Sequence, residues 1–176
     1  MPFAKPAIAA LVATAVLAVS VPSATAQDLG QYLSGYGYSP VSLGKLPTGH
    51  ETLEVEINGV KGRFILDSGA GASVVHTAYA AKYGLNSPTS DDNRTATGAG
   101  GHTAISRHPI DSLSLGGAVM DQKQVSIMDL GGVVAAIKAA TGEEIDGVIG
   151  QDILTRHDAV IDISKQTLYL RTPPGT

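Results

Sequence analysis

The segment from Phe64 to Ala72 reads Phe-Ile-Leu-Asp-Ser-Gly-Ala-Gly-Ala and constrains the fold more than any other part of the sequence. Three apolar residues typical of a buried strand lead directly into Asp67, and only small residues follow it. A carboxylate is costly to remove from water, so an acid in this position needs polar partners or a function. Small residues let backbone or a ligand approach closely. The segment therefore predicts either an active-site loop or an ordinary strand-to-turn junction, since Asp, Ser and Gly all favour turns.

The first 26 residues are predicted to be a secretory signal peptide. Lys5 is their only charge, Ala7 to Val21 is an almost unbroken apolar run, and small residues end the segment before Gln27. An uncleaved membrane anchor is the alternative, although the run is short for a span of ~20 residues. We expect an exported protein, periplasmic or secreted and of bacterial type, with no membrane span once the signal peptide is removed.

Charge and composition exclude several function classes. Without residues 1–26 the net charge changes from −4 to −5, which argues against nucleic-acid binding. The chain has no cysteine, so disulfides, thiol catalysis and cysteine metal sites are excluded. Neither a phosphate-binding loop nor a nucleophile elbow occurs. The five histidines form no i, i+4 pair of the zinc-binding kind, and we expect His102 and His108 to be exposed. No metal or cofactor is therefore expected.

Residue periodicity predicts one mostly-β domain over residues 51–172, after an irregular N-terminal arm over 27–50 with one short strand at Ser39 to Leu43. A hairpin that turns at Asn58-Gly59 leads into Asp67. Further strands are expected at 103–110, 113–115, 124–128, 145–150, 159–163 and 167–170, and short helices at 73–83, 132–141 and 151–156. Many short strands with glycine turns and two or three short helices are typical of a barrel-like domain.

Two blocks of the sequence carry a resemblance to a known family. Phe64 to Ala70 is similar to the apolar-apolar-Asp-Thr/Ser-Gly-Ala signature of aspartic peptidases. Val148-Ile149-Gly150, with the short helix after it, resembles the second block of the retropepsins, at the wider spacing of bacterial single-domain exported relatives. The closing hairpin and a Leu-Ser-Leu-Gly-Gly segment extend the likeness to Leu53 to Leu170. The resemblance implies a single-domain retropepsin-like (acid-protease) β-barrel.

The resemblance also implies a mechanism of peptide-bond hydrolysis. Two carboxylates about 3 Å apart share one proton; one acts as base toward a water and the other as acid toward the scissile carbonyl. The chain has a single Asp-Ser-Gly. Catalysis would therefore need a two-fold homodimer in which Asp67 of each copy meets the other. Ser68 would hydrogen-bond across the axis, and the Gly69 N–H would orient the carboxylate. The expected partner besides the second copy is a peptide or protein substrate.

A glycine-rich segment is the candidate flap over the substrate. Gly98, Gly100 and Gly101 lie in a polar stretch that is either a mobile loop or a hairpin tip. The sequence departs from the viral enzymes at Gly71 and Gln151, where those enzymes carry an Asp and an Arg. Losing both partners of an ion pair leaves no unpaired charge, so the fold need not suffer.

Two alternatives to a peptidase stay open. A catalytically inactive retropepsin-like domain could bind a peptide or protein partner on the same scaffold, although such a binder has no need of the Asp-Ser-Gly triplet. The second alternative is an unrelated exported β-barrel in which the Asp-Ser-Gly triplet occurs by chance.

Overall fold

The computed structural model describes residues 28–85, 94–98 and 101–172, and for 94–98 and 101–103 the backbone alone. The signal-peptide segment over residues 1–26 lies outside this part. The strands are β1 Tyr38–Ser42, β2 Gly44–Lys45, β3 Glu51–Ile57, β4 Val60–Leu66, β5 Val74–His76, β6 Arg94–Gly98, β7 Gly101–Pro109, β8 Leu113–Leu115, β9 Ala118–Val119, β10 Gln124–Met128, β11 Gly147–Ile149, β12 Val160–Asp162 and β13 Thr167–Arg171. The helices are α1 Leu29–Ser34, the 3₁₀ helix η1 Thr77–Tyr83, α2 Gly131–Thr141 and α3 Gln151–Arg156.

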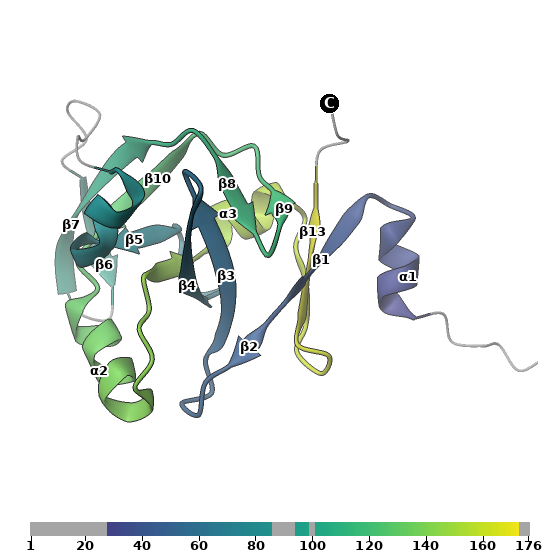
Figure 1. Ribbon diagram of the computed structural model, residues 1–176, viewed down its shortest axis with the longest axis horizontal. Coiled ribbons are helices and arrows are strands. Elements are labelled where there is room, and N and C mark those ends of the chain that lie inside the picture. The colour runs from purple at the N-terminus through teal and green to yellow at the C-terminus, as the bar shows by residue number, and fades with distance from the viewer. Residues whose placement is uncertain (1–27, 86–93, 99–100, 173–176) are drawn as a thin grey trace, which may run out of the picture.

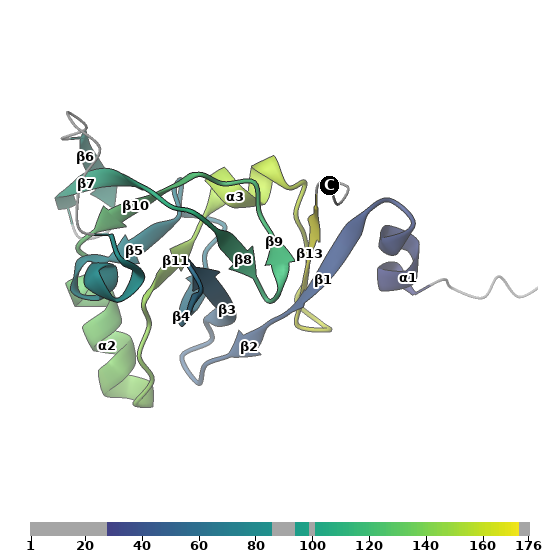
Figure 2. The ribbon, with the colours of Figure 1, turned by 45° about the horizontal axis from the view of Figure 1, so that its top comes forward.

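The strands form two sheets. The larger follows the order β6-β7-β10-β5-β11-β4-β3-β8-β9, with β2 attached to β3, and the smaller follows β1-β13-β12. The smaller sheet and α1 lie on one side of the molecule, and β6, β7 and α2 lie on the other (Figures 1 and 2). The expectation of a mostly-β fold with few short helices is confirmed, but the large sheet does not close into a barrel, because its end strands β6 and β9 do not pair.

The hairpin that leads into Asp67 forms as the sequence predicts. Asn58 and Gly59 both have positive φ, 52° and 78°, which is the geometry of a two-residue type I′ turn. Ile57 then pairs with Val60, and β3 and β4 stay in register up to Thr52 and Ile65. The Asn58 side chain also donates to the Tyr83 carbonyl at 2.9 Å, so the turn is held against η1.

The predicted helix over 73–83 is wrong in its first half. Val74 to His76 form β5, a strand that pairs with β10 on one side and β11 on the other. Val75 is fully buried between these neighbours. Two adjacent β-branched residues suit an extended chain packed on both sides, so tertiary burial outweighs the helical spacing of the apolar residues. The helix begins only at Thr77, and Gly84 ends it in the left-handed region at φ 71°.

The arm over 27–50 is more regular than expected. Asp28 accepts the Gly30 N–H at 2.8 Å and so caps α1, which the sequence reading missed. The strand expected at Ser39 to Leu43 is present as β1, one residue earlier. It pairs with β13 over five residues, from Tyr38 opposite Arg171 to Ser42 opposite Thr167. The arm is thus part of the folded domain, because β13 offers it an open edge.

The core consists of two clusters, and both contain residues of β4, the strand that leads to Asp67. The larger contains Phe64, Val75 and Ile149 together with most buried residues of β1, β3, β8 and β13. The smaller joins Ile65, Val74 and Val148 to α2. Strands β4, β5 and β11 contribute to both clusters, so the segment before Asp67 is packed on both faces. Within the described residues, no helix has the length and apolar character that a membrane crossing requires.

Candidate active site

Strand β4 delivers Asp67 beside the end of β11. The two strands are parallel, with Phe64 opposite Gly147 and Leu66 opposite Ile149. The ladder continues into the turn, because the Asp67 N–H donates to the Ile149 carbonyl at 3.0 Å. The fold therefore brings together the two sequence blocks, Phe64 to Ala70 and Val148 to Gly150, that are about eighty residues apart in the chain.

The Asp67 carboxylate faces solvent at the end of this strand pair. The Gly69 N–H donates to its Oδ1 at 2.8 Å, the contact that the family resemblance implies. Among the described residues, no other hydrogen bond or ion pair reaches this carboxylate. Ser68 and Gly69 are exposed next to it. At this position the chain thus presents an oriented and accessible carboxylate.

Gly150 lets β11 end against the turn that follows Asp67. A Cβ at this position would lie 2.7 Å from the carbonyl oxygens of both Ala70 and Ala72. Real Cβ atoms do not approach backbone oxygens this closely, so only glycine fits without a shift of the turn. The glycine of the second sequence block has a steric role, and its residue type is explained by the close approach of backbone.

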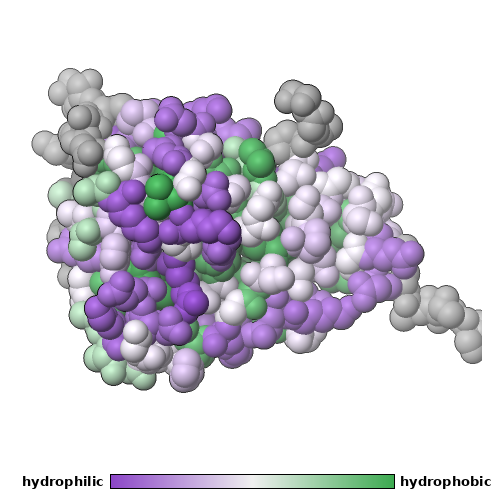
Figure 3. Space-filling model, viewed as in Figure 1, coloured by the Kyte–Doolittle hydropathy of each residue, from purple (hydrophilic) through white to green (hydrophobic). Residues whose placement is uncertain are grey.

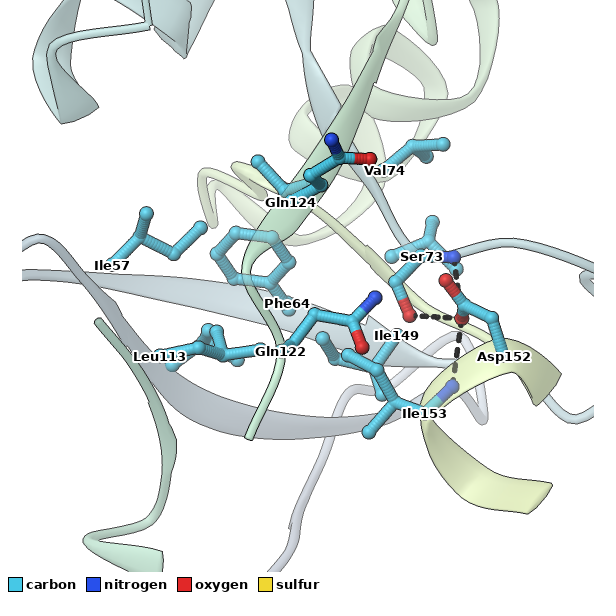
Figure 4. Close-up of a pocket in the computed structure, with 13 residues that line it drawn as sticks. Ile57, Phe64, Ser73, Val74, Leu113, Gln122, Gln124, Ile149, Asp152 and Ile153 are labelled. Carbon is cyan, nitrogen blue, oxygen red and sulfur yellow. Dashed lines mark hydrogen bonds between the residues drawn. The ribbon is translucent and has the colours of Figure 1, made fainter. Parts of the chain in front are cut away.

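A buried polar contact fastens the same turn to α3. Asp152 Oδ1 accepts the Ser73 N–H at 2.8 Å, the Ser73 hydroxyl at 2.6 Å and the Ile153 N–H at 2.9 Å (Figure 4). Ser73 is only 2% exposed, and its hydroxyl oxygen accepts the Gly150 N–H at 2.9 Å. Three segments are joined in this way, and each buried polar atom named here has a partner.

Gln151 makes the second connection between α3 and the turn. Its side-chain amide donates to the Ser68 carbonyl at 2.7 Å, and its backbone N–H donates to the Ala70 carbonyl at 2.8 Å. The sequence reading noted Gln151 only as a lost ion-pair partner and missed Ser73 and Asp152. A signal was present, because Ser73 and Asp152 are polar residues beside apolar runs. Only the fold shows that these two runs are neighbours.

The opposite end of β11 contains a different aspartate. Asp146 is 4% exposed and accepts from the Tyr83 hydroxyl and from Lys82, whose Nζ lies 2.5 Å from Oδ2. Its own N–H donates to the Arg63 carbonyl, four residues before Asp67. Burial, and then the hydrogen bond to Asp146, raise the pKa of Tyr83. Asp146 is therefore a structural acid at the wrong end of the strand to pair with Asp67.

The candidate flap is partly described. Gly98 and Gly101 form the last described pair of β6 and β7, so these two glycines belong to paired strands. Gly100 lies outside the described residues. The hairpin belongs to the sheet that holds Asp67, connected to β4 through β10, β5 and β11.

The histidines have structural surroundings. His76 is buried and its Nδ1 accepts the Leu130 N–H at 3.1 Å, while the buried His157 donates from Nδ1 to the Arg171 carbonyl at 2.9 Å. The expectation that His108 is exposed is wrong, since it is 4% exposed. His108 lies opposite Val125 of β10, and its Nε2 is 3.0 Å from the Ser106 hydroxyl oxygen. His102 lies outside the described side chains. No group of three potential metal ligands gathers among the described residues.

Three hollows differ in what they could hold. The void among the core residues around Phe64 and Ser73 is about 10 Å³, which is near the minimum for one water (Figure 4). A groove of about 540 Å³ runs over β3 and β4, where hydrophilic side chains gather (Figure 3). Its charged side chains form ion pairs, for example Lys61 with Glu54 at 2.8 Å. A third hollow, of about 390 Å³, begins at Ser68 and is adjacent to the candidate site.

Comparisons with known proteins agree with this geometry. A family model described as aspartyl protease matches residues 53–153, which include both sequence blocks. A search of the curated proteins found no match. Among solved structures, a retropepsin-like aspartic protease from Rickettsia conorii is 20% identical, with a TM-score of 0.53 over 76% of this chain and 98% of that one.

Two further structures are similar at lower TM-scores. The EIAV protease complexed with the inhibitor HBY-793 is 21% identical, with a TM-score of 0.45 over 64% of this chain and 88% of that one. The retroviral protease-like domain of Ddi1 from Leishmania major is 23% identical, with a TM-score of 0.47 over 70% of this chain and 93% of that one. The Rickettsia structure supports the retropepsin-like fold, and the family model supplies the family.

Proposed function

Because this chain belongs to the aspartyl protease family, with a retropepsin-like fold, we propose that it is an exported aspartic endopeptidase that acts as a homodimer. The observation that carries the proposal is the state of Asp67. Its carboxylate is exposed at the end of β4, is oriented by the Gly69 N–H at 2.8 Å, and lies beside the second sequence block of the family.

The chemistry follows from bringing two such carboxylates together. At about 3 Å they cannot both ionise, so the pair holds one proton at working pH. The ionised Asp67 takes a proton from the bound water, whose oxygen attacks the scissile carbonyl carbon. The protonated Asp67 of the other copy gives its proton to the carbonyl oxygen. The Asp67 that took the water proton then gives it to the leaving nitrogen, a diol hydroxyl returns its proton to the other Asp67, and the C–N bond cleaves to give a carboxylic acid and an amine.

The remaining parts of the site support the same proposal. Gln151 and the Ser73–Asp152 contact hold the turn that carries Asp67, which keeps the carboxylate in a reproducible position. The β6–β7 hairpin is the candidate lid that would exclude water from the bound peptide. Residues 1–26 are proposed to direct the protein out of the cytoplasm.

The decisive experiment replaces Asp67 with Asn. Asp67→Asn keeps the size and the acceptor for the Gly69 N–H but removes the shared proton. We expect peptide cleavage to fall by roughly 10²–10⁴-fold, with an unchanged unfolding temperature. Asp111→Asn is the matched control, because that residue is exposed and its side chain has no hydrogen bond among the described residues. A statine-type inhibitor should block the wild type, and activity should rise toward acidic pH.

One observation favours the alternative, a non-catalytic peptide-binding domain. A single copy supplies only one Asp-Ser-Gly, so a chain that stays monomeric has half a site. Cleavage that survives in Asp67→Asn contradicts the peptidase mechanism. A wild-type chain that binds peptides, stays monomeric at micromolar concentration and turns none over supports the binding domain.

A further inference from the structure

We infer that the groove over β3 and β4 is a second contact surface for the substrate peptide, and that it favours substrates with acidic side chains several residues away from the scissile bond. This inference rests on the proposed function, because it takes the cleaved peptide to be centred on Asp67. The groove would add a determinant of specificity that lies outside the Asp67 turn and that acts on binding, not on the chemical step.

The first step is that the groove and Asp67 lie along one face of β4. Side chains alternate along a strand, so Lys61 and Arg63 point to the same side of β4 as Asp67, whose N–H extends the ladder with β11. Ile65, which is on this face, packs into the smaller core cluster, whereas Phe64 packs into the larger one. At about 3.3 Å per residue, Arg63 is roughly 13 Å from Asp67, a distance that an extended peptide crosses with about four residues.

The second step is the size of the groove and its connection to the Asp67 turn. Its volume of about 540 Å³ is in the range of ligand-binding pockets. Its lining includes the apolar side chains of Leu46, Pro47 and Leu53. Leu46 belongs to the smaller core cluster with Ile65, and Ala70 of the Asp67 turn packs against the same cluster. The lining of the groove and the turn that carries the acid thus share one apolar cluster.

The third step is the sign of the charge in the groove. Its lining contains three cations and two acids, which are Lys45, Lys61, Arg63, Glu54 and Glu143. The chain as a whole has a net charge of −4, so the groove is a locally positive region on an acidic protein. A positive region attracts an acidic peptide segment and disfavours a basic one. Charge complementarity therefore selects acidic side chains for this part of the substrate.

The fourth step is that the cations are held by exposed ion pairs. Lys61 lies 2.8 Å from Glu54, and the two side chains are 63% and 56% exposed. Arg63 pairs with Glu143, and each of these side chains is 47% exposed. Pairs this exposed contribute little to stability, so a substrate carboxylate can join or replace them at small cost. Within the described residues Arg63 bonds Glu143 through one Nη atom alone, which leaves guanidinium donors for a further carboxylate.

Peptides of different charge test the groove. The probe is a peptide that the wild type cleaves, lengthened so that a pair of Glu, Gln or Lys residues stands about four to six positions from the scissile bond on both sides. We expect the KM of the Glu peptide to be about three- to tenfold below that of the Gln peptide, with kcat unchanged, because the contact is equal in the ground and transition states. The difference should shrink in about 0.5 M salt, which screens exposed charges. Equal KM values for the three peptides overturn the inference.

The double variant Lys61→Gln with Arg63→Gln removes two cations from the groove. Both side chains are exposed, so the fold should be retained, and we expect the advantage of the Glu peptide to disappear. Glu at both positions should make the Lys peptide the better substrate. Lys138→Gln is the matched control, because this exposed cation also pairs with an acid, Glu144 at 2.7 Å, but does not line the groove. An advantage that survives in the double variant, or that Lys138→Gln removes equally, contradicts the inference.

Binding without turnover separates this inference from the proposed function. In Asp67→Asn, the fluorescence anisotropy of the labelled peptides should give the lowest Kd for the Glu peptide and the highest for the Lys peptide. That order, together with cleavage that survives in Asp67→Asn, supports the groove and contradicts the proposed function. Equal binding of the three peptides by an inactive Asp67→Asn contradicts the groove alone.

Discussion

At the scale of single residues, the site depends on contacts that hold the Asp67 turn from behind. Ser73 is buried and joins the turn to Asp152 and to Gly150, while Gln151 holds the Ser68 carbonyl. None of these side chains bonds the Asp67 carboxylate itself. We assign them a positioning role, because a catalytic pair separated by about 3 Å tolerates little movement of either acid.

Two substitutions at Asp152 measure this role. Asp152→Ala removes the oxygen that accepts three donors, and leaving buried donors unpaired costs about 1–3 kcal/mol of unfolding free energy. Asp152→Asn keeps that oxygen and should cost much less. We also expect kcat to fall in Asp152→Ala, with KM little changed, when both variants are assayed well below their unfolding temperatures. Equal kcat in the two variants would show that the contact serves stability alone.

At the scale of elements, the arm is fastened by charge as well as by the β1–β13 ladder. Lys165 beside Asp28, together with the Gly30 N–H, lowers the pKa of Asp28, and the same pair raises the pKa of Lys165. The Asp28 contribution to stability is present above its unfolded pKa of 3.8 and is lost as pH falls through the lower folded value. The arm should therefore loosen in strong acid.

The Asp28→Asn variant isolates that contribution. Asn is as good an N-cap as Asp, so the start of α1 is kept while the pair with Lys165 is lost. We expect the protection of the β1 amides, corrected for the chemical exchange rate, to fall as pH drops below about 3.8 in the wild type and to lose most of this pH dependence in the variant. A wild type whose β1 exchange does not depend on acid beyond its chemical rate would contradict the role of the pair.

The elements also show where sequence reasoning succeeds. The β3–β4 hairpin, β10 and α3 form where the sequence predicts them, because local turn chemistry and periodicity agree with the tertiary structure. The β5 strand was predicted as helix, since the spacing of its apolar residues fits both. Hydrogen bonding to β10 and β11 stabilises the extended conformation of residues 74–76. The neighbouring residues in the sequence do not reveal that these two strands are available as partners.

At the scale of the whole molecule, activity should depend on protein concentration. One chain carries one exposed Asp67 turn, so the active form is proposed to be the dimer. Below the dissociation constant the initial rate should grow with the square of enzyme concentration, and above it in direct proportion. The test is the rate measured across a dilution series, with sedimentation of the same samples. A rate that stays proportional to concentration in samples that sediment as monomers would contradict a shared site.

The sequence by itself determined the family and the position of the acid. The two blocks around Asp67 and Gly150 are local patterns of apolar strand, small turn and short helix, and such patterns can be read from neighbouring residues. It also led to the prediction that one chain holds half of the proposed catalytic pair, because the Asp-Ser-Gly triplet occurs once.

Only the tertiary structure decided how the acid is held and which surface stays open. Ser73 bonds Asp152, which lies 79 residues later in the chain. Ser39 of β1 contacts Thr172, just after β13, across 133 residues. Contacts at such separations follow from the tertiary packing of the two sheets and their core clusters, and not from local propensity. The same packing closes one edge of the small sheet and leaves β12 beside the Asp67 turn.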